Sequence, residues 1–255
     1  MLEVNQDNYY TDTGHMSVSQ YKAMLKCQGG RIEDVDKSPA LLIGSYVDSY
    51  IEGTLDKFKE EHPEIYSSRG TNKGELKSEF KIAQKVCDYL DDDDVSKMFL
   101  SGEKQTIMTG QISDVPFKIK MDSYIPHKAI VDLKVMATIR RKNGKLYNFI
   151  KEWGYDIQLA CYQEIVRQNT GEQLPCYIVV ATKETPIECR VIQIPQRELN
   201  LQLELVKSNI EDLYKVLIGE REPIYCKKCP KCIKEQRYDK IITTDDLEEV
   251  EENFN

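Results

Sequence analysis

The chain begins with three segments whose apolar residues recur at helical spacing. These segments are Ser17 to Cys27, Pro39 to about Gly53, and Lys77 to Leu90. Apolar positions three and four residues apart predict one buried helix face, so we expect the first third of the chain to be helical. Ser17 or Ser19 is a candidate cap for the first helix. The acidic run Asp91 to Asp94 is expected to be a turn or a helix cap, with a metal site as the weaker alternative.

The middle of the chain changes to a period of two. Between Pro116 and Ile125, Phe117, Ile119 and Met121 alternate with polar residues, which predicts a strand with one buried face. The segment from Ala129 to Met136 is rich in Ile and Val and predicts a second strand. Because Pro126, His127 and Lys128 separate the two, we expect a β-hairpin with these residues as its loop.

Helical and strand patterns alternate again in the last third of the chain. We expect a helix from Trp153 to Gln168, a strand buried on both faces from Cys176 to Thr182, and a strand from Arg190 to Ile194. A long helix is predicted from Gln196 to Ile218, ended by Gly219. Helices around a small mixed sheet indicate an α/β (α+β) domain.

Composition and charge leave several functions open. Among 255 residues, 40% are hydrophobic and 31% charged, as in a globular protein with a core. No apolar run approaches a membrane span, and residues 1–10 lack a signal-peptide pattern, so we expect a cytoplasmic protein without a membrane role. Six acidic residues after position 244 account for most of the net charge of −8, leaving −2 elsewhere. We therefore expect one domain over 1–235 with room for a local basic groove, and an acidic tail over 236–255.

The hairpin carries the residues of greatest chemical interest. Asp132 and Lys134 share one face of their strand, because side chains alternate along a strand. If the loop is Pro126-His127-Lys128, Asp122 lies directly opposite Asp132. Two like charges in that position destabilise a sheet, and a divalent cation between them would reverse the sign of that effect. The alternative without a metal is a surface hairpin with an Asp–Lys ion pair.

Oxygen ligands of this kind favour Mg²⁺ or Mn²⁺ over zinc. Such an ion can polarise a phosphodiester and supply a hydroxide nucleophile. Lys134 could position the attacking water or stabilise charge on the phosphate. The spacing is therefore compatible with phosphodiester hydrolysis at Asp122, Asp132 and Lys134.

Two further pairs add to this arrangement. Gln158 and Tyr162 are four residues apart on a predicted helix and share one face, where they could bind a phosphate or a base. Asp48 lies on the second predicted helix, one turn before Glu52, and could supply a third carboxylate to the metal. The alternatives are a surface pair on a helix and a solvated helix face.

Together these residues resemble a known motif set. Asp122, Asp132-Leu133-Lys134 and the trailing Gln158 and Tyr162 look like the motifs of the RecB-like family of PD-(D/E)xK nucleases, with its QxxxY. That family has a metal-binding His four residues after an upstream Gly; here Gly44 matches and the His position is Asp48. The layout from about Met16 to Cys232 most resembles phage RecE-like exonucleases of the exonuclease VIII type.

This resemblance implies a fold and an activity. The fold would be a restriction-endonuclease-like core with a central mixed sheet flanked by helices. The activity would be Mg²⁺-dependent digestion of linear double-stranded DNA from its ends, 5′-to-3′, in phage-type homologous recombination. A single-strand annealing protein would be the partner, and a homo-oligomer is a further expectation. Two alternatives stay open: a non-catalytic, metal-clasped DNA-binding protein, and a RecB-like nuclease of repair or CRISPR adaptation that acts on single strands.

The C-terminal region holds a dense array of thiols at Cys226, Cys229 and Cys232. Three thiolates cannot complete a four-coordinate site, so a fourth ligand must come from elsewhere. The arrangement is similar to that of AddB-type and CRISPR-associated nucleases, in which one N-terminal cysteine joins three C-terminal ones around a [4Fe–4S] cluster. That resemblance implies Cys27 as the fourth ligand and a structural role for the cluster. Zinc is the alternative metal, and surface thiols that bind no metal are the alternative without a metal site.

Overall fold

The computed structural model describes residues 4–29, 39–235, 241 and 243–246. The helices within these ranges are α1 (Val18–Lys26), α2 (Pro39–Glu52), α3 (Leu55–Glu61), α4 (Ser78–Asp92), α5 (Asp94–Phe99), α6 (Phe149–Trp153), α7 (Tyr155–Thr170), α8 (Gln196–Lys207), α9 (Ile210–Leu217) and α10 (Pro230–Glu235), with short 3₁₀ turns at Pro63–Ile65 and Thr244–Asp246. The strands are β1 (Met16–Ser17), β2 (Glu103–Ile112), β3 (Val115–Ile125), β4 (Ala129–Met136), β5 (Cys176–Thr182) and β6 (Cys189–Ile194). None of these helices combines the length and apolarity that crossing a bilayer requires.

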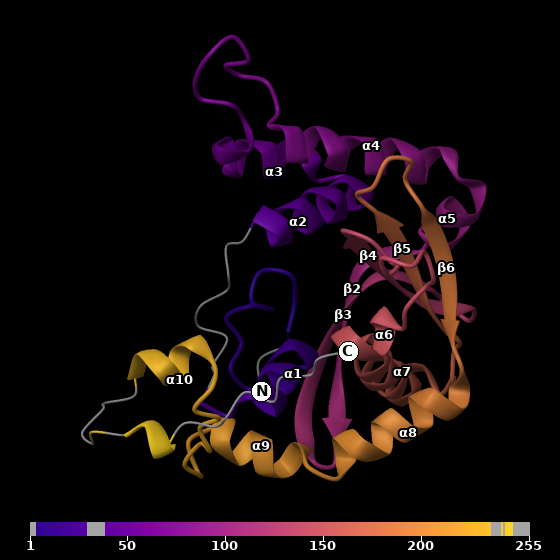
Figure 1. Ribbon diagram of the computed structural model, residues 1–255. Coiled ribbons are helices and arrows are strands. Elements are labelled where there is room, and N and C mark those ends of the chain that lie inside the picture. The colour runs from indigo at the N-terminus through magenta and orange to yellow at the C-terminus, as the bar shows by residue number, and fades with distance from the viewer. Residues whose placement is uncertain (1–3, 30–38, 236–240, 242, 247–255) are drawn as a thin grey trace.

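The strands form one mixed sheet of six, in the order β1-β3-β4-β5-β6, with β2 paired to β3. The β4–β5 pair is parallel and is connected through α6 and α7, whereas β2–β3, β3–β4 and β5–β6 are antiparallel. Figure 1 shows α2 and α4 on one side of this sheet and α7, α8 and α9 on the other. The predicted α+β architecture with a central mixed sheet is therefore confirmed.

Two apolar cores cover the two faces of the sheet. Alternate residues of β5, Ile178 and Val180, belong to the core shared with α7, while Val179 and Ala181 belong to the core shared with α2 and α4. All four side chains are fully buried. This is the burial on both faces that the continuous apolar run of β5 predicts.

Several sequence predictions are confirmed closely. β4 and β5 have the predicted bounds, and Ser17 caps α1, where its side chain and that of Gln20 form a capping box. The hairpin loop lies at residues 126–128, with Lys128 N–H donating to Ile125 O. Within the acidic run, the Asp93 side chain caps α5 by accepting a hydrogen bond from Ser96 N–H, as the turn-or-cap prediction required.

Other predictions were wrong or concern residues outside the described ranges. The single helix predicted from Gln196 to Ile218 is two helices, α8 and α9, interrupted at Ser208 and Asn209. The Asn209 side chain accepts a hydrogen bond from the buried Tyr21 hydroxyl, so the break ties this region to α1. β2 was not predicted. The acidic tail predicted over 236–255 lies almost wholly outside the described residues.

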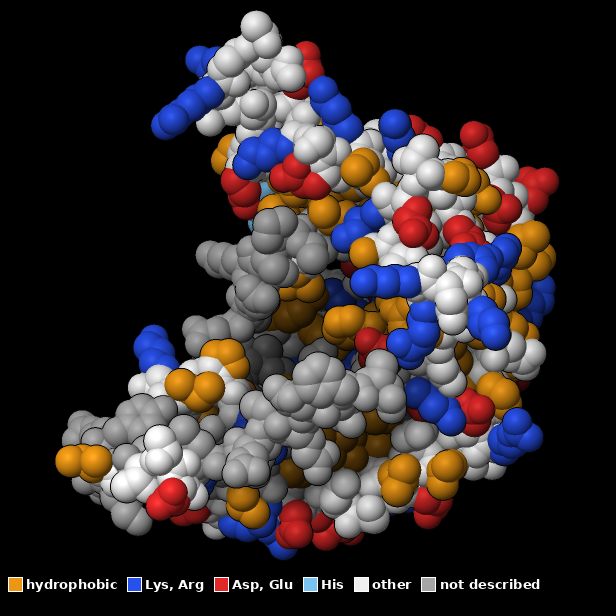
Figure 2. All heavy atoms as spheres, viewed as in Figure 1, with side chains coloured by type: hydrophobic (Ala, Val, Ile, Leu, Met, Phe, Trp, Pro, Cys, Tyr) orange, Lys and Arg blue, Asp and Glu red, His pale blue; other side chains and the backbone are white. Residues whose placement is uncertain are grey.

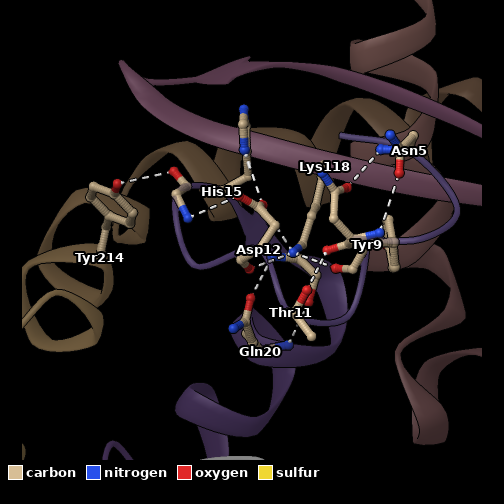
Figure 3. Close-up of polar contacts among 11 residues, drawn as sticks. Asn5, Tyr9, Thr11, Asp12, His15, Gln20, Lys118 and Tyr214 are labelled. Carbon is tan, nitrogen blue, oxygen red and sulfur yellow. Dashed lines mark hydrogen bonds and ion pairs between the residues drawn. The ribbon is translucent and has the colours of Figure 1, made fainter. Parts of the chain in front are cut away.

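The polar face predicted for β3 is also not simply exposed to solvent. Lys118 is buried, and its ammonium group donates to Tyr9 O, to Asp12 O and to Asp12 Oδ2 at 2.7, 2.7 and 3.0 Å. Figure 3 shows Lys118 directed into the N-terminal segment between these acceptors. An ammonium group has three N–H donors, so these three contacts satisfy it. The segment preceding α1 is thereby fastened to the central sheet.

Replacing Leu159 of α7 by Ala should lower the free energy of unfolding by about 2–5 kcal/mol, because it leaves a cavity in a packed core. Leu159 is fully buried against the sheet. Leu201→Ala on α8 is the matched control, since Leu201 is 59% exposed and should change the stability by no more than about 0.5 kcal/mol. Urea unfolding measures both, and equal effects of the two variants would contradict the packing described here.

Replacing Asp12 by Asn should destabilise the protein by about 1.5–3 kcal/mol at neutral pH, because the buried Lys118 loses a charged hydrogen-bond partner. Burial favours a raised pKa for Asp12, but the hydrogen bonds from Lys118 and from Gly14 N–H outweigh it and lower the pKa. A lowered folded-state pKa stabilises the fold above the unfolded value of about 4, and this contribution is lost as the pH falls through the folded-state value.

The difference in unfolding free energy between wild type and Asp12→Asn should therefore be constant near neutral pH and shrink below about pH 4. Urea titrations between pH 3 and pH 7 would measure it. Asp7→Asn, an exposed change in the same segment, should stay close to wild type at neutral pH. A difference that persists unchanged at pH 3 would rule out the charged contact.

Candidate active site

Two carboxylates meet where β3 and β4 separate. The hairpin has the predicted register as far as the pair Ser123↔Val131, and the paired ladder ends there, one position before Asp122 and Asp132. Beyond it, Asp122 Oδ2 accepts a hydrogen bond from Leu133 N–H at 2.9 Å. A side chain of β3 thus takes the place of a backbone acceptor, and β4 continues with β5 as its partner.

Asp132 is almost fully buried and incompletely hydrogen-bonded. Its Oδ1 accepts from Gln158 Nε2 at 2.7 Å, and Lys134 Nζ lies 2.6 Å from Oδ2. Apart from this ion pair, the buried Oδ2 has no hydrogen-bond partner among the described residues. Burial raises the pKa of Asp132 to about 7; the Lys134 charge opposes this rise and the Asp122 charge adds to it.

Helix α2 brings two more carboxylates to the same place. Burial raises the pKa of Asp48 well above its usual value, the Asp122 charge raises it further, and the Lys134 charge opposes the rise. The pKa of Glu52, one turn later, is raised by burial, lowered by Lys120 and raised by Asp122. Asp48 is therefore within electrostatic reach of the hairpin residues, as predicted, although it is more than 70 positions away in sequence.

Helix α7 supplies the predicted Gln158 and Tyr162. Gln158 Nε2 also donates to the Tyr162 hydroxyl at 3.1 Å, and that hydroxyl donates to Lys120 O at 2.9 Å. The pair therefore links the Asp132 carboxylate to the backbone of β3. Both side chains are engaged with the protein, which favours a role in fixing the site over a free helix-surface pair.

Sequence reasoning missed two residues beside Lys134. The ring of Tyr155 contacts two cations, with Lys134 Nζ 5.1 Å and Lys22 Nζ 5.3 Å from its centroid. Burial and the charge of Lys134 lower the pKa of Lys22 to about 8. Neither residue belongs to a recognisable motif, and Lys22 comes from α1, so no local pattern connects it with the hairpin.

The residues of this site fit a divalent cation. Asp122, Asp132 and Asp48 offer oxygen donors, the kind that Mg²⁺ and Mn²⁺ prefer. The buried Oδ2 of Asp132, whose sole described partner is the Lys134 ammonium, has lone pairs left for a metal ion. Among the described residues, these carboxylates do not come together as tightly as the cysteines considered below, whose ligand atoms all lie within 4.8 Å of one another.

Basic residues follow the site strand along the chain. The loop after β4 carries Arg140, Arg141, Lys142 and Lys145, and the first three help line an open pocket together with Asn143, Tyr147 and Glu152. Arg140 is paired with Glu188, whereas Arg141 lies over the Tyr147 ring at 5.2 Å. In Figure 2 the molecule is hollowed between the part containing α2–α4 and the part containing α9 and α10, and α1 and α2 lie on opposite sides of this hollow (Figure 1).

The structure brings the four predicted cysteines together. The Sγ atoms of Cys27, Cys226, Cys229 and Cys232 all lie within 4.8 Å of one another. The Cys232 sulfur is 3.5 Å from that of Cys27 and 3.8 Å from that of Cys226. Backbone N–H groups of Cys226, Cys229 and Cys232 point at these sulfurs, and those of Lys228 and Cys229 lower the pKa of Cys226 to about 6.

The residues next to these cysteines also bring the two segments of the chain together. Gln28 Oε1 accepts a hydrogen bond from Ile224 N–H at 3.0 Å, next to the cysteines of both segments. A Cβ atom at Gly29 would meet the Tyr225 ring at 2.4 Å, so the close approach requires glycine there. The segment after α1 and the C-terminal arm are thus packed together, and the cluster is compatible with metal binding.

This combination of fold and site defines a class of protein. A mixed sheet flanked by helices, with an Asp and an Asp-x-Lys where two strands separate, is the restriction-endonuclease-like arrangement of PD-(D/E)xK nucleases. The chain belongs to the family described as “PDDEXK-like domain of unknown function (DUF3799)”, whose model matches residues 17–235. No curated protein matches the chain.

One solved structure gives the same picture of the fold. A crystal structure of a “Putative exonuclease” from Eubacterium rectale is 42% identical to this chain, covers 95% of it and 97% of its own length, and has a TM-score of 0.85. A structure of SSO0001 is 12% identical over 85% of this chain and 94% of its own, with a TM-score of 0.30, too low to bear on the fold. The family and the first structure support a nuclease. The roles of the individual site residues stay predictions.

Proposed function

We propose that this protein is a Mg²⁺- or Mn²⁺-dependent exonuclease that hydrolyses phosphodiester bonds of linear double-stranded DNA. The observation that carries the proposal is the Asp132 carboxylate, buried beside Asp122, with Gln158 on one oxygen and Lys134 as the sole described partner of the other. Several buried carboxylates close together repel one another, and Lys134 supplies a single positive charge against Asp132. A divalent ion would offset the remaining repulsion and serve catalysis at the same position.

In this proposal each residue of the site has a separate role. Asp122, Asp132 and Asp48 would hold the ion, which when bound polarises a phosphate and lowers the pKa of bound water. Lys134, held by its ion pair with Asp132 and by the Tyr155 ring, presents a positive charge to an attacking water or to the phosphate. Gln158 orients the Asp132 carboxylate, and Tyr162 fixes Gln158 against β3.

The finer parts of the proposal rest on resemblance. Digestion from DNA ends is supported by the name of the Eubacterium rectale protein and by the RecE-like motif layout. The 5′-to-3′ direction, a role in phage-type recombination, a single-strand annealing partner and a homo-oligomer follow from that layout alone. A nuclease that prefers single strands is the alternative with the same site, and a DNA-binding protein without turnover is the alternative without catalysis.

Incubation with Mg²⁺ and either linear or covalently closed circular duplex DNA tests the activity directly. Wild type should degrade only the linear form. Asp132→Asn should lower the rate by a thousandfold or so, because the loss of one ligand to the ion removes several kcal/mol of transition-state stabilisation. Asp56→Asn on α3, an exposed change outside the site, is the matched control and should keep the wild-type rate.

The outcomes separate the alternatives. Digestion of single-stranded but not duplex DNA would favour the repair-type nuclease with the same residues. Binding of DNA without hydrolysis by folded, metal-supplied wild type would favour the non-catalytic protein. Full activity of Asp132→Asn would refute the site itself.

We further propose that the four cysteines hold one structural zinc ion. Four thiolates at about 2.3 Å from a single zinc lie roughly 3.8 Å from one another in a tetrahedron. The sulfur separations of 3.5 and 3.8 Å support that arrangement. In a [4Fe–4S] cluster each cysteine binds a different iron, so the sulfurs lie farther apart. The zinc would fasten the C-terminal arm to the end of α1.

Purified protein should contain about one zinc per chain, and Cys229→Ser should reduce this to well below half, because three thiolates leave the tetrahedral site incomplete. Its melting temperature should fall as well, since structural zinc contributes directly to folding free energy. Cys189→Ser is the matched control, because Cys189 is a partly buried thiol outside the cluster. Metal analysis of anaerobically prepared protein measures the content. Four irons per chain would replace zinc by the iron–sulfur alternative, and the absence of both metals would exclude a metal clasp.

A further inference from the structure

An exposed tyrosine stands beside the carboxylate site. Tyr10 has 80% of its surface exposed, although it belongs to the segment that Lys118 fastens to the sheet. Its hydroxyl accepts a hydrogen bond from Lys120 Nζ at 2.8 Å, and the same ammonium lies 4.7 Å from the centre of the Tyr10 ring. Tyr9 packs edge-on against it, with ring centroids 5.3 Å apart. The protein therefore holds an exposed aromatic ring beside a half-buried cation.

The segment that presents Tyr10 is fixed in place. Besides the contacts of Lys118 with the backbone of Tyr9 and with Asp12, His15 Nδ1 lies 3.1 Å from Asp12 Oδ2, and Gly14 N–H donates to Asp12 Oδ1. Figure 3 shows these contacts converging on Asp12 and Lys118. A buried lysine is a costly way to hold an ordinary surface loop, because its charge must be fully partnered.

Several contacts tie this segment to the carboxylates. Gln6 Nε2 donates to Gln105 O at 2.6 Å, and Gln105 Nε2 donates to Asp122 Oδ1 at 3.4 Å. Lys120 precedes Asp122 by two residues on β3, a distance of about 7 Å along a strand. The Tyr162 hydroxyl donates to the backbone oxygen of Lys120. Because side chains alternate along a strand, Lys120 and Asp122 lie on the same face of β3.

We propose that Tyr10 and Lys120 form the contact for a single-stranded end of the nucleic acid as it enters the site, with a nucleobase stacked on Tyr10 and a phosphate bound by Lys120. This inference rests on the proposed nuclease function and adds a substrate-positioning element to it. Neither residue belongs to the motif set of the hairpin and α7.

The chemistry matches a frayed strand. An aromatic face takes any base by stacking, and a neighbouring cation takes the phosphate without reading sequence. Among the described contacts of Lys120, the Tyr10 hydroxyl takes one of the three N–H donors, so donors are left for phosphate oxygens. A distance of about 7 Å corresponds to roughly two nucleotides of a duplex strand at about 3.4 Å each. A phosphate bound by Lys120 would therefore leave its neighbours within reach of the carboxylates.

A competing explanation is that Tyr10 only shields the charge of Lys120. The two explanations differ in what the ring contacts, so the test removes the ring and the base separately. The probe is a fluorescein-labelled twelve-nucleotide oligothymidylate, alone or with a row of abasic sites near its 5′ or its 3′ end, bound in EDTA so that no hydrolysis occurs. Anisotropy gives Kd for wild type, Tyr10→Ala, Tyr10→Phe and the control Tyr89→Ala, an exposed-tyrosine change on α4.

Wild type should bind the intact strand about tenfold more tightly than one of the abasic strands, within a range of roughly 5- to 150-fold for one stacked base. Tyr10→Ala should lose this preference and bind both strands equally, whereas Tyr10→Phe and Tyr89→Ala should keep it. Equal affinity of wild type for intact and abasic strands, or an unchanged preference in Tyr10→Ala, would overturn the proposal.

Failure of this inference is distinguishable from failure of the proposed function. Wild type that degrades linear DNA but shows no Tyr10-dependent preference would overturn the Tyr10 contact and leave the nuclease intact. Wild type that shows the preference in EDTA but degrades no DNA with Mg²⁺ would support the Tyr10 contact and point to the non-catalytic alternative.

Discussion

Two carboxylates carried at the same level of neighbouring strands repel each other, and the region around Asp122 and Asp132 is arranged in response to that repulsion. The β3–β4 ladder ends immediately before them, Asp122 accepts a hydrogen bond from the backbone of β4, and β4 takes β5 as its continuing partner. Lys134 and Gln158 each approach one oxygen of Asp132. This concentration of unfavourable charge persists because the two apolar cores on either face of the sheet hold the strands in position.

Helix α1 joins the peripheral parts of the molecule to this centre. Its first turn follows the short strand β1, which pairs with β3, and its middle carries Lys22 to the Tyr155 ring beside Lys134. The residue that ends it, Cys27, belongs to the thiol cluster. A clasp at that cluster would therefore restrain α1 and with it the position of Lys22. The segment that precedes α1 in sequence is fastened through Lys118 and presents Tyr10.

Sequence patterns predicted the elements whose periodicity is strong. The alternation in β3, the apolar runs of β4 and β5 and the helical spacing in α4 and α7 each place apolar residues on one side or both, and burial enforces the result. The sequence pattern did not predict β2, because most of its residues are only partly buried and Gly110 interrupts the pattern. Pairing with β3 stabilises this strand. The break between α8 and α9 was not predicted, because the apolar spacing continues across it. Its Asn209 side chain accepts a hydrogen bond from Tyr21 of another helix.

The sequence by itself determined the local half of the site. Alternation puts Asp132 and Lys134 on one face, the length of the loop sets Asp122 against them, and a helical period of four joins Gln158 to Tyr162, because each relation spans residues linked by a single element. Only the tertiary structure decided that Asp48, Lys22 and Asp12 approach β3 and β4, and that Cys27 meets Cys232, 205 positions later. Those contacts depend on how helices pack on the two faces of the sheet, and periodicity carries no information about which faces meet.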